Sequence, residues 1–502
     1  MKVFASRLFP VALSLLTVSL VHGDWKSDIG WPEFVAEAGP GYPDGSGVLV
    51  VQVEADESYS TPGEQYVPND ADPQMSGKTI LDATGGGDVS SHALTVAKLF
   101  YGNSSSIAPG VNDILVYEAN DYLSSLSGIS SSRRVHSNAW VSGASTSTLG
   151  SIDQKINSKG FLLVAGLSNQ NTSSVPDIFG TTYNALSVGL SDGGHSSGGT
   201  VKAGYGPGRV KPEVVIPHGT SPGNSWTSFA TGEVSSVAAV LYDEAASGGH
   251  SDAEENSEVM KAILMAGAVK YKFPGWDRTT TRPLDEVYGA GEVNIFHSYR
   301  ILAAGEQSSG GSVASTGWSY SFLQILQNNS TTERSYSFTL ADTAAEFSAV
   351  LNWNYSGSGT LRNLGLRLER TDGGTVLYDE SQSEVDNVEH IYYRNLPAGS
   401  YTLKATLEDS STAGVYFGLA WRTELGGGAV SEIALDGGQP EIMVSNVFKG
   451  KEHKIRRSVD LISWADVHTF TPTSWDDYSW TDLTVDPGMD SPRFYRTEWG
   501  DP

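Results

Sequence analysis

The chain has 502 residues, which is too long for one ordinary domain, so we expect two to four domains. Its hydrophobic fraction of 39% is enough to build real cores and excludes a compositionally disordered chain. With 32 Lys and Arg against 58 Asp and Glu, the net charge of -26 would repel nucleic acid and anionic membrane surfaces, which argues against both as partners. The lack of cysteine excludes disulfides, thiolate zinc sites and a cysteine nucleophile.

The N-terminus has the pattern of a signal peptide. Lys2 and Arg7 supply a positive flank, and a short apolar run follows at Val11–Val21. Gly23 then offers a small residue for cleavage. The run is too short to span a bilayer with ease, although an uncleaved anchor stays open as an alternative. The sequence therefore predicts a signal peptide over residues 1–23 and a mature protein without a membrane span, secreted or periplasmic.

From about residue 45 to residue 303, short β-branched runs alternate with helical runs. The predicted strands are 47–53, 114–117, 161–165, 185–189 and 214–216, and the predicted helices are 92–100, 229–241 and 258–268. Strands that alternate with helices imply a mostly parallel sheet covered by helices on both faces. We therefore expect an α/β domain over residues 24–305.

The pattern changes after this domain. Residues 306–317 are rich in Gly and Ser, which is typical of a linker. Alternating apolar residues between turn signals then predict a β-sandwich over residues 318–424. A glycine run at Gly426–Gly428 marks a second break, and residues 425–502 are expected to form a further small β module.

Residues suited to acyl-transfer chemistry lie at strand ends and helix starts. In chain order they are Glu54 with Asp56, His92, Asn169 and Ser228. A serine hydroxyl needs an adjacent base such as imidazole, and a carboxylate fixes the imidazole tautomer. An Asn amide can donate to a developing oxyanion, together with a backbone N–H at a helix N-terminus. Because parallel strands end at the same edge of a sheet, we expect these side chains to converge there.

The order acid, His, Asn, Ser resembles the catalytic domain of the subtilisin-like serine peptidases, the subtilases. Lys211–Pro217 is similar to the family's KPDVVAPG run, and Thr227–Thr231 is similar to its GTSMATP nucleophile motif. Ser106–Val116 resembles its GVAPGADILVV run, and Leu284–Asn294 resembles its closing GYGRVNA. The resemblance implies a parallel-sheet, subtilisin-like catalytic domain.

Carried onto this sequence residue by residue, the resemblance implies that Ser228 is the nucleophile, His92 the general base and Asn169 the oxyanion donor. Glu54 occupies the place of the family's orienting aspartate. Asp56 lies two residues further along and stays open as the alternative acid. These roles imply a secreted serine endopeptidase that hydrolyses peptide bonds through a Ser-His-Glu triad.

Other segments carry the resemblance more loosely. Val135–Trp140 resembles the strand that lines the family's substrate cleft, where a peptide would add as an extended strand. Leu396–Leu403 resembles part of the pre-peptidase C-terminal β-sandwich found after secreted bacterial peptidases. The sequence departs from the family where His92–Thr95 replaces HGTH, where Trp226 replaces a glycine, and where Gly232-Glu233 replaces Pro-His.

The predicted reaction needs no cofactor, and its partners would be protein or peptide substrates. We expect a monomer. Calcium stays open as a structural ion, but the sequence has no dedicated ligand set. One acidic cluster fits no EF-hand loop and is expected to be a solvated surface, namely Asp476, Asp477, Asp482 and Asp486.

Two other functions stay open. One is a catalytically inactive subtilase fold that binds peptides or acts as a scaffold, which the altered motifs favour. The other is a surface adhesin or glycan binder that acts through the two C-terminal β modules. Truncation near residue 305 should separate them, because a peptidase is expected to keep hydrolysing without these modules.

Overall fold

The structure is a computed structural model, and parts of the chain are left undescribed. The described residues are 25–57, 64–217, 226–273, 275–326, 330–425, 429–436, 438–445, 447, 452–459, 463–472, 478–485 and 493–499. The predicted signal peptide over residues 1–23 therefore lies outside them. No helix within the described ranges is long and apolar enough to cross a membrane.

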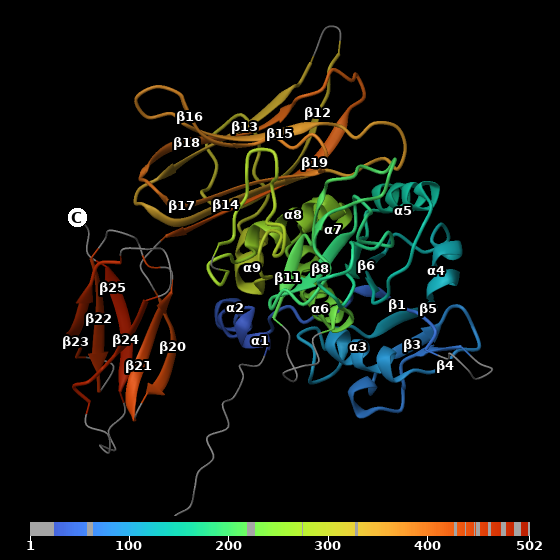
Figure 1. Cartoon of the computed structure of the whole chain (residues 1–502), viewed down its shortest axis with the longest axis horizontal. Coiled ribbons are helices and arrows are strands. Elements are labelled where there is room, and N and C mark those ends of the chain that lie inside the picture. The colour runs from blue at the N-terminus through green and yellow to red at the C-terminus, as the bar shows by residue number, and fades with distance from the viewer. Residues whose placement is uncertain are drawn as a thin grey trace, which may run out of the picture.

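Within the described residues, the first domain is built on a seven-stranded parallel sheet (Figure 1). Its strand order is β11 (Val214–Ile216), β8 (Leu186–Leu190), β7 (Leu162–Gly166), β6 (Arg133–Asn138), β1 (Leu49–Glu54), β5 (Asp113–Glu118) and β3 (Thr79–Asp82). Strands β7 and β8 are buried at every residue, as expected for a sheet covered on both faces. The predicted α/β fold class is confirmed.

Helices cover both faces of this sheet. The core on one face includes residues of α1 (Trp25–Asp28), α2 (Trp31–Ala38), α3 (Ser91–Tyr101), α6 (Thr227–Ser247), α7 (Ser251–Glu255), α8 (Ser257–Gly267) and α9 (Ile295–Ala303). The other face packs on α4 (Ala119–Ser125) and α5 (Thr146–Lys159). Alternation along β1 shows the two faces, since Val50 belongs to the first core and Val51 to the second. The short strands are β2 (Gln65–Val67), β4 (Asp88–Val89), β9 (Gly198–Gly199) and β10 (Val210–Lys211).

An antiparallel β-sandwich follows, as the sequence predicts. One sheet has the order β12 (Gly317–Leu323), β19 (Val415–Leu425), β14 (Ala344–Asn352) and β17 (Val388–Leu396). The other has the order β13 (Glu333–Leu340), β18 (Gly399–Leu407), β15 (Leu364–Arg370) and β16 (Val376–Ser381). Alternating side chains from both sheets fill the core between them.

The sandwich packs directly on the first domain. Strands β14 and β19 lie against α8, and every residue of α8 is buried (Figure 1). Trp318, Val350 and Ala420 of the sandwich belong to the same hydrophobic core as the first domain's helices. At Gly418 an added Cβ would lie 2.6 Å from the Cα of Val259, so only glycine allows α8 to approach this closely. The two domains therefore share one continuous core.

Buried charges join the two domains as well. Arg422 of β19 pairs with Glu346 of β14 at 2.8 Å and donates to the backbone carbonyl of Ala266 in α8 at 3.1 Å. Burial raises the pKa of Glu346, but the charge of Arg422 and hydrogen bonds outweigh it and lower that pKa to about 2. Lys270 donates to the Ser348 hydroxyl at 3.1 Å across the same boundary. Charges buried in this way need their partners, so separating the domains would leave them unpaired.

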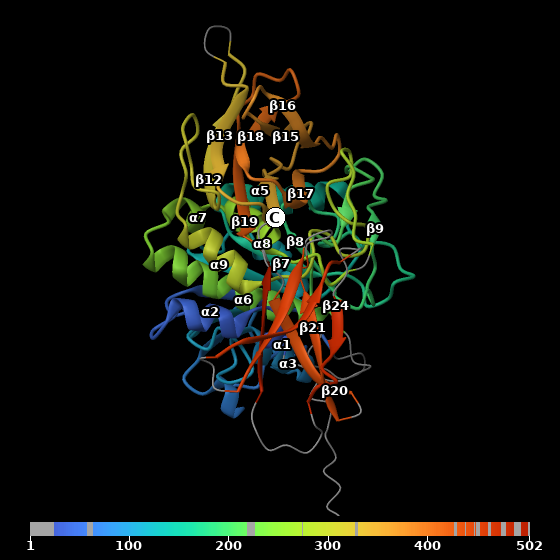
Figure 2. The same ribbon diagram turned by 90° about the vertical axis from the view of Figure 1, so that its left-hand side faces the viewer.

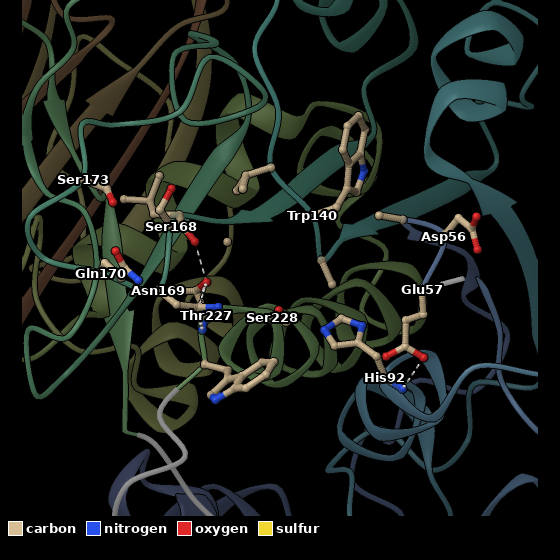
Figure 3. Close-up of a pocket in the computed structure, with 16 residues that line it drawn as sticks. Asp56, Glu57, His92, Trp140, Ser168, Asn169, Gln170, Ser173, Thr227 and Ser228 are labelled. Carbon is tan, nitrogen blue, oxygen red and sulfur yellow. Dashed lines mark hydrogen bonds between the residues drawn. The ribbon is translucent and has the colours of Figure 1, made fainter. Parts of the chain in front are cut away.

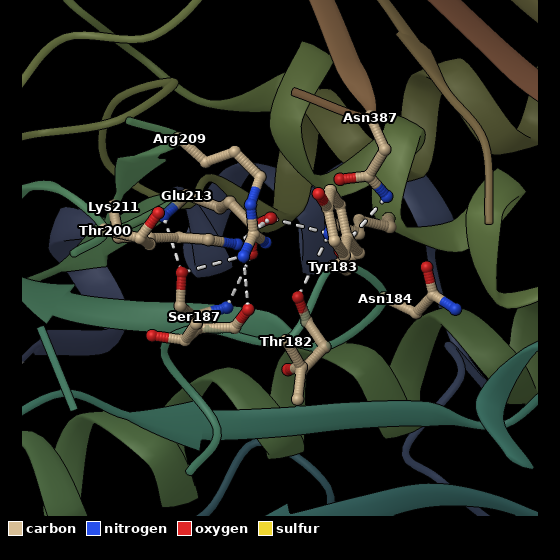
Figure 4. A network of polar contacts seen from close by, with 12 residues as sticks. Thr182, Tyr183, Asn184, Ser187, Thr200, Arg209, Lys211, Glu213 and Asn387 are labelled. Atoms are coloured by element: carbon tan, nitrogen blue, oxygen red, sulfur yellow. Dashed lines mark hydrogen bonds and ion pairs between the residues drawn. The ribbon is translucent and has the colours of Figure 1, made fainter. Parts of the chain in front are cut away.

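A second buried network lies at the edge of the sheet (Figure 4). The Glu213 Oε1 atom lies 2.6 Å from the Nζ atoms of both Lys211 and Lys261. Lys261, from α8, also donates to the backbone carbonyl of Tyr183 at 3.0 Å. Asn387 of the sandwich donates to that same carbonyl at 3.1 Å. The charged residues of the Lys-Pro-Glu motif are thus structural, and they link the sheet to the helix beneath the sandwich.

The Gly/Ser-rich segment over residues 306–317 is held against the sandwich. The Gln307 N–H donates to the Trp318 carbonyl, and the Val313 N–H donates to the Ser337 carbonyl, both at 2.7 Å. The segment therefore runs as part of the sandwich surface rather than as a free tether.

The last module is a small all-β unit of two sheets (Figure 2). One sheet has the order β20 (Ala429–Asp436), β21 (Gln439–Ser445) and β24 (Tyr478–Thr481). The other has the order β23 (Ala465–Phe470), β22 (His453–Ser458) and β25 (Phe494–Trp499). Of the predicted solvated acidic cluster, only Asp482 is described; the prediction is wrong for it, because it is fully buried and bonds Arg457 at 2.6 Å.

Candidate active site

A pocket of about 620 Å³ lies at the carboxyl edge of the sheet, where β1, β6 and β7 end and α3 and α6 begin (Figure 3). His92, Asn169 and Ser228 all line it, and so does Asp56. Glu54 lies behind His92 and is fully buried. The structure thus brings together side chains that are separated by well over a hundred residues of sequence.

The imidazole of His92 is held by Glu54. Ser90 caps α3 by accepting a hydrogen bond from the Ala93 N–H at 2.9 Å, which places His92 in the first helical turn. The His92 Nδ1 atom lies 2.7 Å from the Oε2 atom of Glu54, the last residue of β1. This bond leaves the other ring nitrogen for the pocket. Such a pair fixes the ring orientation that a general base requires.

The second oxygen of Glu54 is held too. Gln52 donates to Glu54 Oε1 at 2.7 Å and to the Ala93 carbonyl at 2.9 Å. The Tyr101 hydroxyl in turn donates to Gln52 Oε1 at 2.5 Å. Asp56, by contrast, accepts from the backbone N–H of Gln65 at 2.7 Å. The longer carboxylate of Glu54 is therefore the one that contacts His92.

Glu57 is a neighbour of His92 that the sequence patterns did not indicate. Its Oε2 atom accepts from the Ser90 hydroxyl at 2.7 Å. The same atom accepts from the His92 backbone N–H at 3.4 Å (Figure 3). Burial lowers the pKa of His92, but the hydrogen bond and charge of Glu54, with the charge of Glu57, outweigh it and raise that pKa above its ordinary value. Both acids therefore favour the protonated imidazolium.

Asn169 is oriented by the first residue of α6. The Thr227 N–H donates to Asn169 Oδ1 at 2.8 Å, and the Thr227 hydroxyl lies 2.8 Å from the same oxygen. With its carbonyl held in this way, the amide nitrogen of Asn169 is left for the pocket. At Gly166 an added Cβ would lie 2.9 Å from the Thr227 carbonyl oxygen, so glycine lets the end of β7 approach α6.

Ser228 is the second residue of α6, and it is 9% exposed. Figure 3 places it between the Asn169–Thr227 pair and the ring of His92. Its backbone N–H lies in the first helical turn, where the helix itself supplies no acceptor. Among the described contacts no hydrogen bond joins Ser228 to His92.

Aromatic rings form the rim beside Ser228. Trp226 stacks on Phe229 with ring centroids 5.9 Å apart, and Phe229 lies 6.1 Å from the His92 ring. Trp226 is 45% exposed, so the residue that stands where the subtilase motif has glycine adds an indole to the pocket wall.

The segment expected to line the substrate cleft does so only at its end. Residues 135–138 belong to β6, which pairs with β1 and β7 inside the sheet. Ala139, Trp140 and Val141, which follow the strand, line the pocket. Among the residues that the structure describes, no group of three or more His, Asp or Glu could hold a metal ion.

Comparison with known families identifies the first domain. Residues 75–291 match the model of the subtilase family, and this range holds His92, Asn169 and Ser228 but begins after Glu54. Comparison with curated proteins gave no match. The matched range spans most of the parallel sheet and the helix that begins at the pocket. Over residues 75–291, therefore, the first domain is a domain of the subtilase family of serine peptidases.

Proposed function

We propose that this protein is a secreted serine endopeptidase in which Ser228 is the nucleophile, His92 the general base and Glu54 the orienting acid. The main support is the 2.7 Å hydrogen bond between His92 Nδ1 and the buried Glu54, in the pocket that also holds Ser228 and Asn169. The family of the first domain implies protein or peptide substrates. The signal-like N-terminal pattern supports export.

In the proposed reaction, His92 Nε2 takes the proton of the Ser228 hydroxyl as the oxygen attacks the scissile carbonyl. Glu54 stabilises the imidazolium that forms. The Asn169 amide and the Ser228 N–H donate to the oxyanion of the tetrahedral intermediate. His92 then protonates the leaving amine, and water hydrolyses the acyl-enzyme by the same steps. Asp56 has no role in this scheme.

Replacement of Ser228 by Ala is expected to abolish labelling by a tagged fluorophosphonate, which reacts only with activated serines. The measurement compares the purified chain from Asp24 onward with Ser228→Ala, Glu54→Ala and Asp56→Ala. We expect labelling to be lost in the first, greatly slowed in the second, and retained in the third. Absence of labelling in folded wild-type protein, from mildly acidic to alkaline pH, would contradict the proposal and favour an inactive peptide-binding fold.

Replacement of Asn169 by Ala is expected to lower kcat about 10²–10³-fold with little change in KM, because the lost donor acts on the transition state. Steady-state hydrolysis of a fluorogenic peptide measures both constants. Gln170→Ala, at the neighbouring pocket position, is the matched control and should change kcat by far less. A similar fall in the control would mean that the loop, and not the amide donor, is responsible.

A further inference from the structure

A second pocket of about 810 Å³ lies where the β-sandwich meets the first domain. The first domain contributes Asn157 at the end of α5 and Glu258 at the start of α8, and the sandwich contributes the loops after β14 and β18. Helix α6 begins at the active-site pocket and ends at Ser247, just before α7 and α8. Since a helix of this length spans about 30 Å, the two pockets lie at opposite ends of the domain.

Two stacked tyrosines form one wall of this pocket. Tyr320 of β12 and Tyr416 of the neighbouring strand β19 have ring centroids 5.3 Å apart and an interplanar angle of 18°. Tyr416 also contacts Phe322, with ring centroids 4.6 Å apart, but it is 54% exposed, so about half of this residue stays open to solvent. Such rings offer a surface on which C–H groups pack, while their hydroxyls stay available for hydrogen bonds.

The loop after β14 adds two lining residues, Asn354 and Arg362, each with a buried polar atom that lacks a partner among the described residues. The Asn354 side chain donates to Glu258 at 2.7 Å, but its Oδ1 atom is buried and has no hydrogen bond among the described residues. Arg362 Nε donates to Asp409 at 2.9 Å, while Arg362 Nη1 is likewise buried without a partner in the described part of the chain. An unpaired buried donor or acceptor costs free energy, so these two atoms favour an occupant that can pair with both once a side-chain rotation turns them toward the pocket.

The pocket carries little net charge. The charge of Arg362 is balanced by Asp409 at 2.9 Å. Burial raises the pKa of Glu258 to about 7, so this carboxyl is largely protonated at mildly acidic pH and can itself donate a hydrogen bond. The other polar lining groups are neutral amides and hydroxyls, such as Asn157, Asn256 and Ser358. A phosphate or a charged peptide finds no unpaired ion among these described lining residues, whereas a neutral polyhydroxylated ligand matches them.

We propose that this pocket binds a neutral saccharide, one face of whose ring packs on Tyr416 and Tyr320 while its hydroxyls bond Asn354 and Arg362. Hydroxyl groups both donate and accept hydrogen bonds, and the axial C–H groups of a sugar ring form an apolar face. One ligand can therefore pack on the tyrosines and also pair with the polar atoms of Asn354 and Arg362. Binding at this distance from the proposed nucleophile would hold the protein on a polysaccharide and raise its effective concentration near substrates there. The proposal does not depend on the active-site pocket being catalytic.

Affinity electrophoresis of the full chain tests the proposal, with gels that contain dextran, laminarin, xylan or galactomannan, and alginate as an anionic control. We expect at least one neutral polysaccharide to retard the wild-type protein. Tyr416→Ala should weaken that retardation at least about ten-fold in apparent Kd, while Tyr416→Phe keeps the ring and should change it by no more than about three-fold. Leu377→Ala, at an exposed position of β16 in the other sheet, is the matched control and should bind as wild type.

The outcomes separate cleanly because Tyr416 is exposed and its replacement can be checked for folding by circular dichroism. Loss of retardation in folded Tyr416→Ala, with retention in Tyr416→Phe and Leu377→Ala, supports the proposal. Failure of all four neutral polysaccharides to retard the wild type overturns it. Retardation that persists in Tyr416→Ala also overturns it, since binding would then lie elsewhere, as in the last module.

Discussion

Replacement of Glu54 by Gln is expected to lower kcat/KM about 10⁴-fold, the size of effect seen when an orienting acid is neutralised in such a triad. The carboxylate of Glu54 accepts a hydrogen bond from His92 Nδ1 at 2.7 Å, which fixes the tautomer whose Nε2 can take a proton. An amide can present its NH₂ group to Nδ1 instead and so stabilise the wrong tautomer. Hydrolysis of a fluorogenic peptide under first-order conditions measures the effect.

The pH profile gives a second readout of the same change. The charge of Glu54 helps to raise the pKa of His92, and the imidazole is a base only above that pKa. Without this charge the pKa falls, so the residual activity of Glu54→Gln should persist to lower pH than that of wild type. Asp56→Asn is the control, and it should leave the acidic side of the pH–rate profile unchanged. The assigned role of Glu54 would be contradicted if the pH at which activity falls on the acidic side stayed the same in Glu54→Gln, or if it shifted in Asp56→Asn.

A chain that ends at Gly305 is expected to lose its fold, whereas one that ends at Leu425 is expected to keep it. The shorter chain would expose α8, all of whose residues are buried, and would lack core residues such as Trp318 and Val350. Each fully buried large apolar side chain contributes about 1.5–3 kcal/mol, and a domain has only about 5–15 kcal/mol of net stability, so these losses are decisive.

Circular dichroism, size-exclusion chromatography and fluorophosphonate labelling of both chains check this expectation. The chain ending at Leu425 should elute as a compact species and label at the wild-type rate. The chain ending at Gly305 should aggregate or lack a cooperative thermal transition. If it instead folds and labels like wild type, then the first domain does not need the shared core to fold. Residues 306–317 would then connect two domains that fold independently, as their composition suggests.

Five of the seven sheet strands could be predicted because buried parallel strands are continuous apolar runs, such as β7 (Leu162–Gly166), whereas the partly exposed β3 (Thr79–Asp82) was not indicated. Helix α5 (Thr146–Lys159) could not be predicted. Its buried Leu149, Ile152 and Ile156 form a helical stripe, but the Ser, Thr and Gly residues around them are typical of loops. The packing of residues 306–317 against the sandwich could not be predicted from their composition either, because it depends on backbone hydrogen bonds and not on side chains.

The candidate active site, too, could be predicted from the sequence only in part. Convergence of Glu54, His92, Asn169 and Ser228 at one sheet edge follows from strand ends and helix starts, which are local signals. Which of Glu54 and Asp56 contacts His92 could not be read from the sequence, since one ends β1 and the other lies only two residues further along. Glu57 was not indicated, because its bond to the Ser90 hydroxyl joins residues 33 positions apart. A contact of that kind depends on tertiary packing between Glu57 and the start of α3, which no local pattern reports.

The shared core of the first two domains has an evolutionary consequence. A sandwich attached by a loose tether can be exchanged between genes as a cassette, whereas one that covers a buried helix can be replaced only if its surface fits that helix. Gly418, whose lack of a Cβ admits the backbone of α8, makes this fit exacting. Recombination that spares function should therefore cut this gene near the codon for Leu425, and the two larger domains should be inherited together while the last module is free to vary.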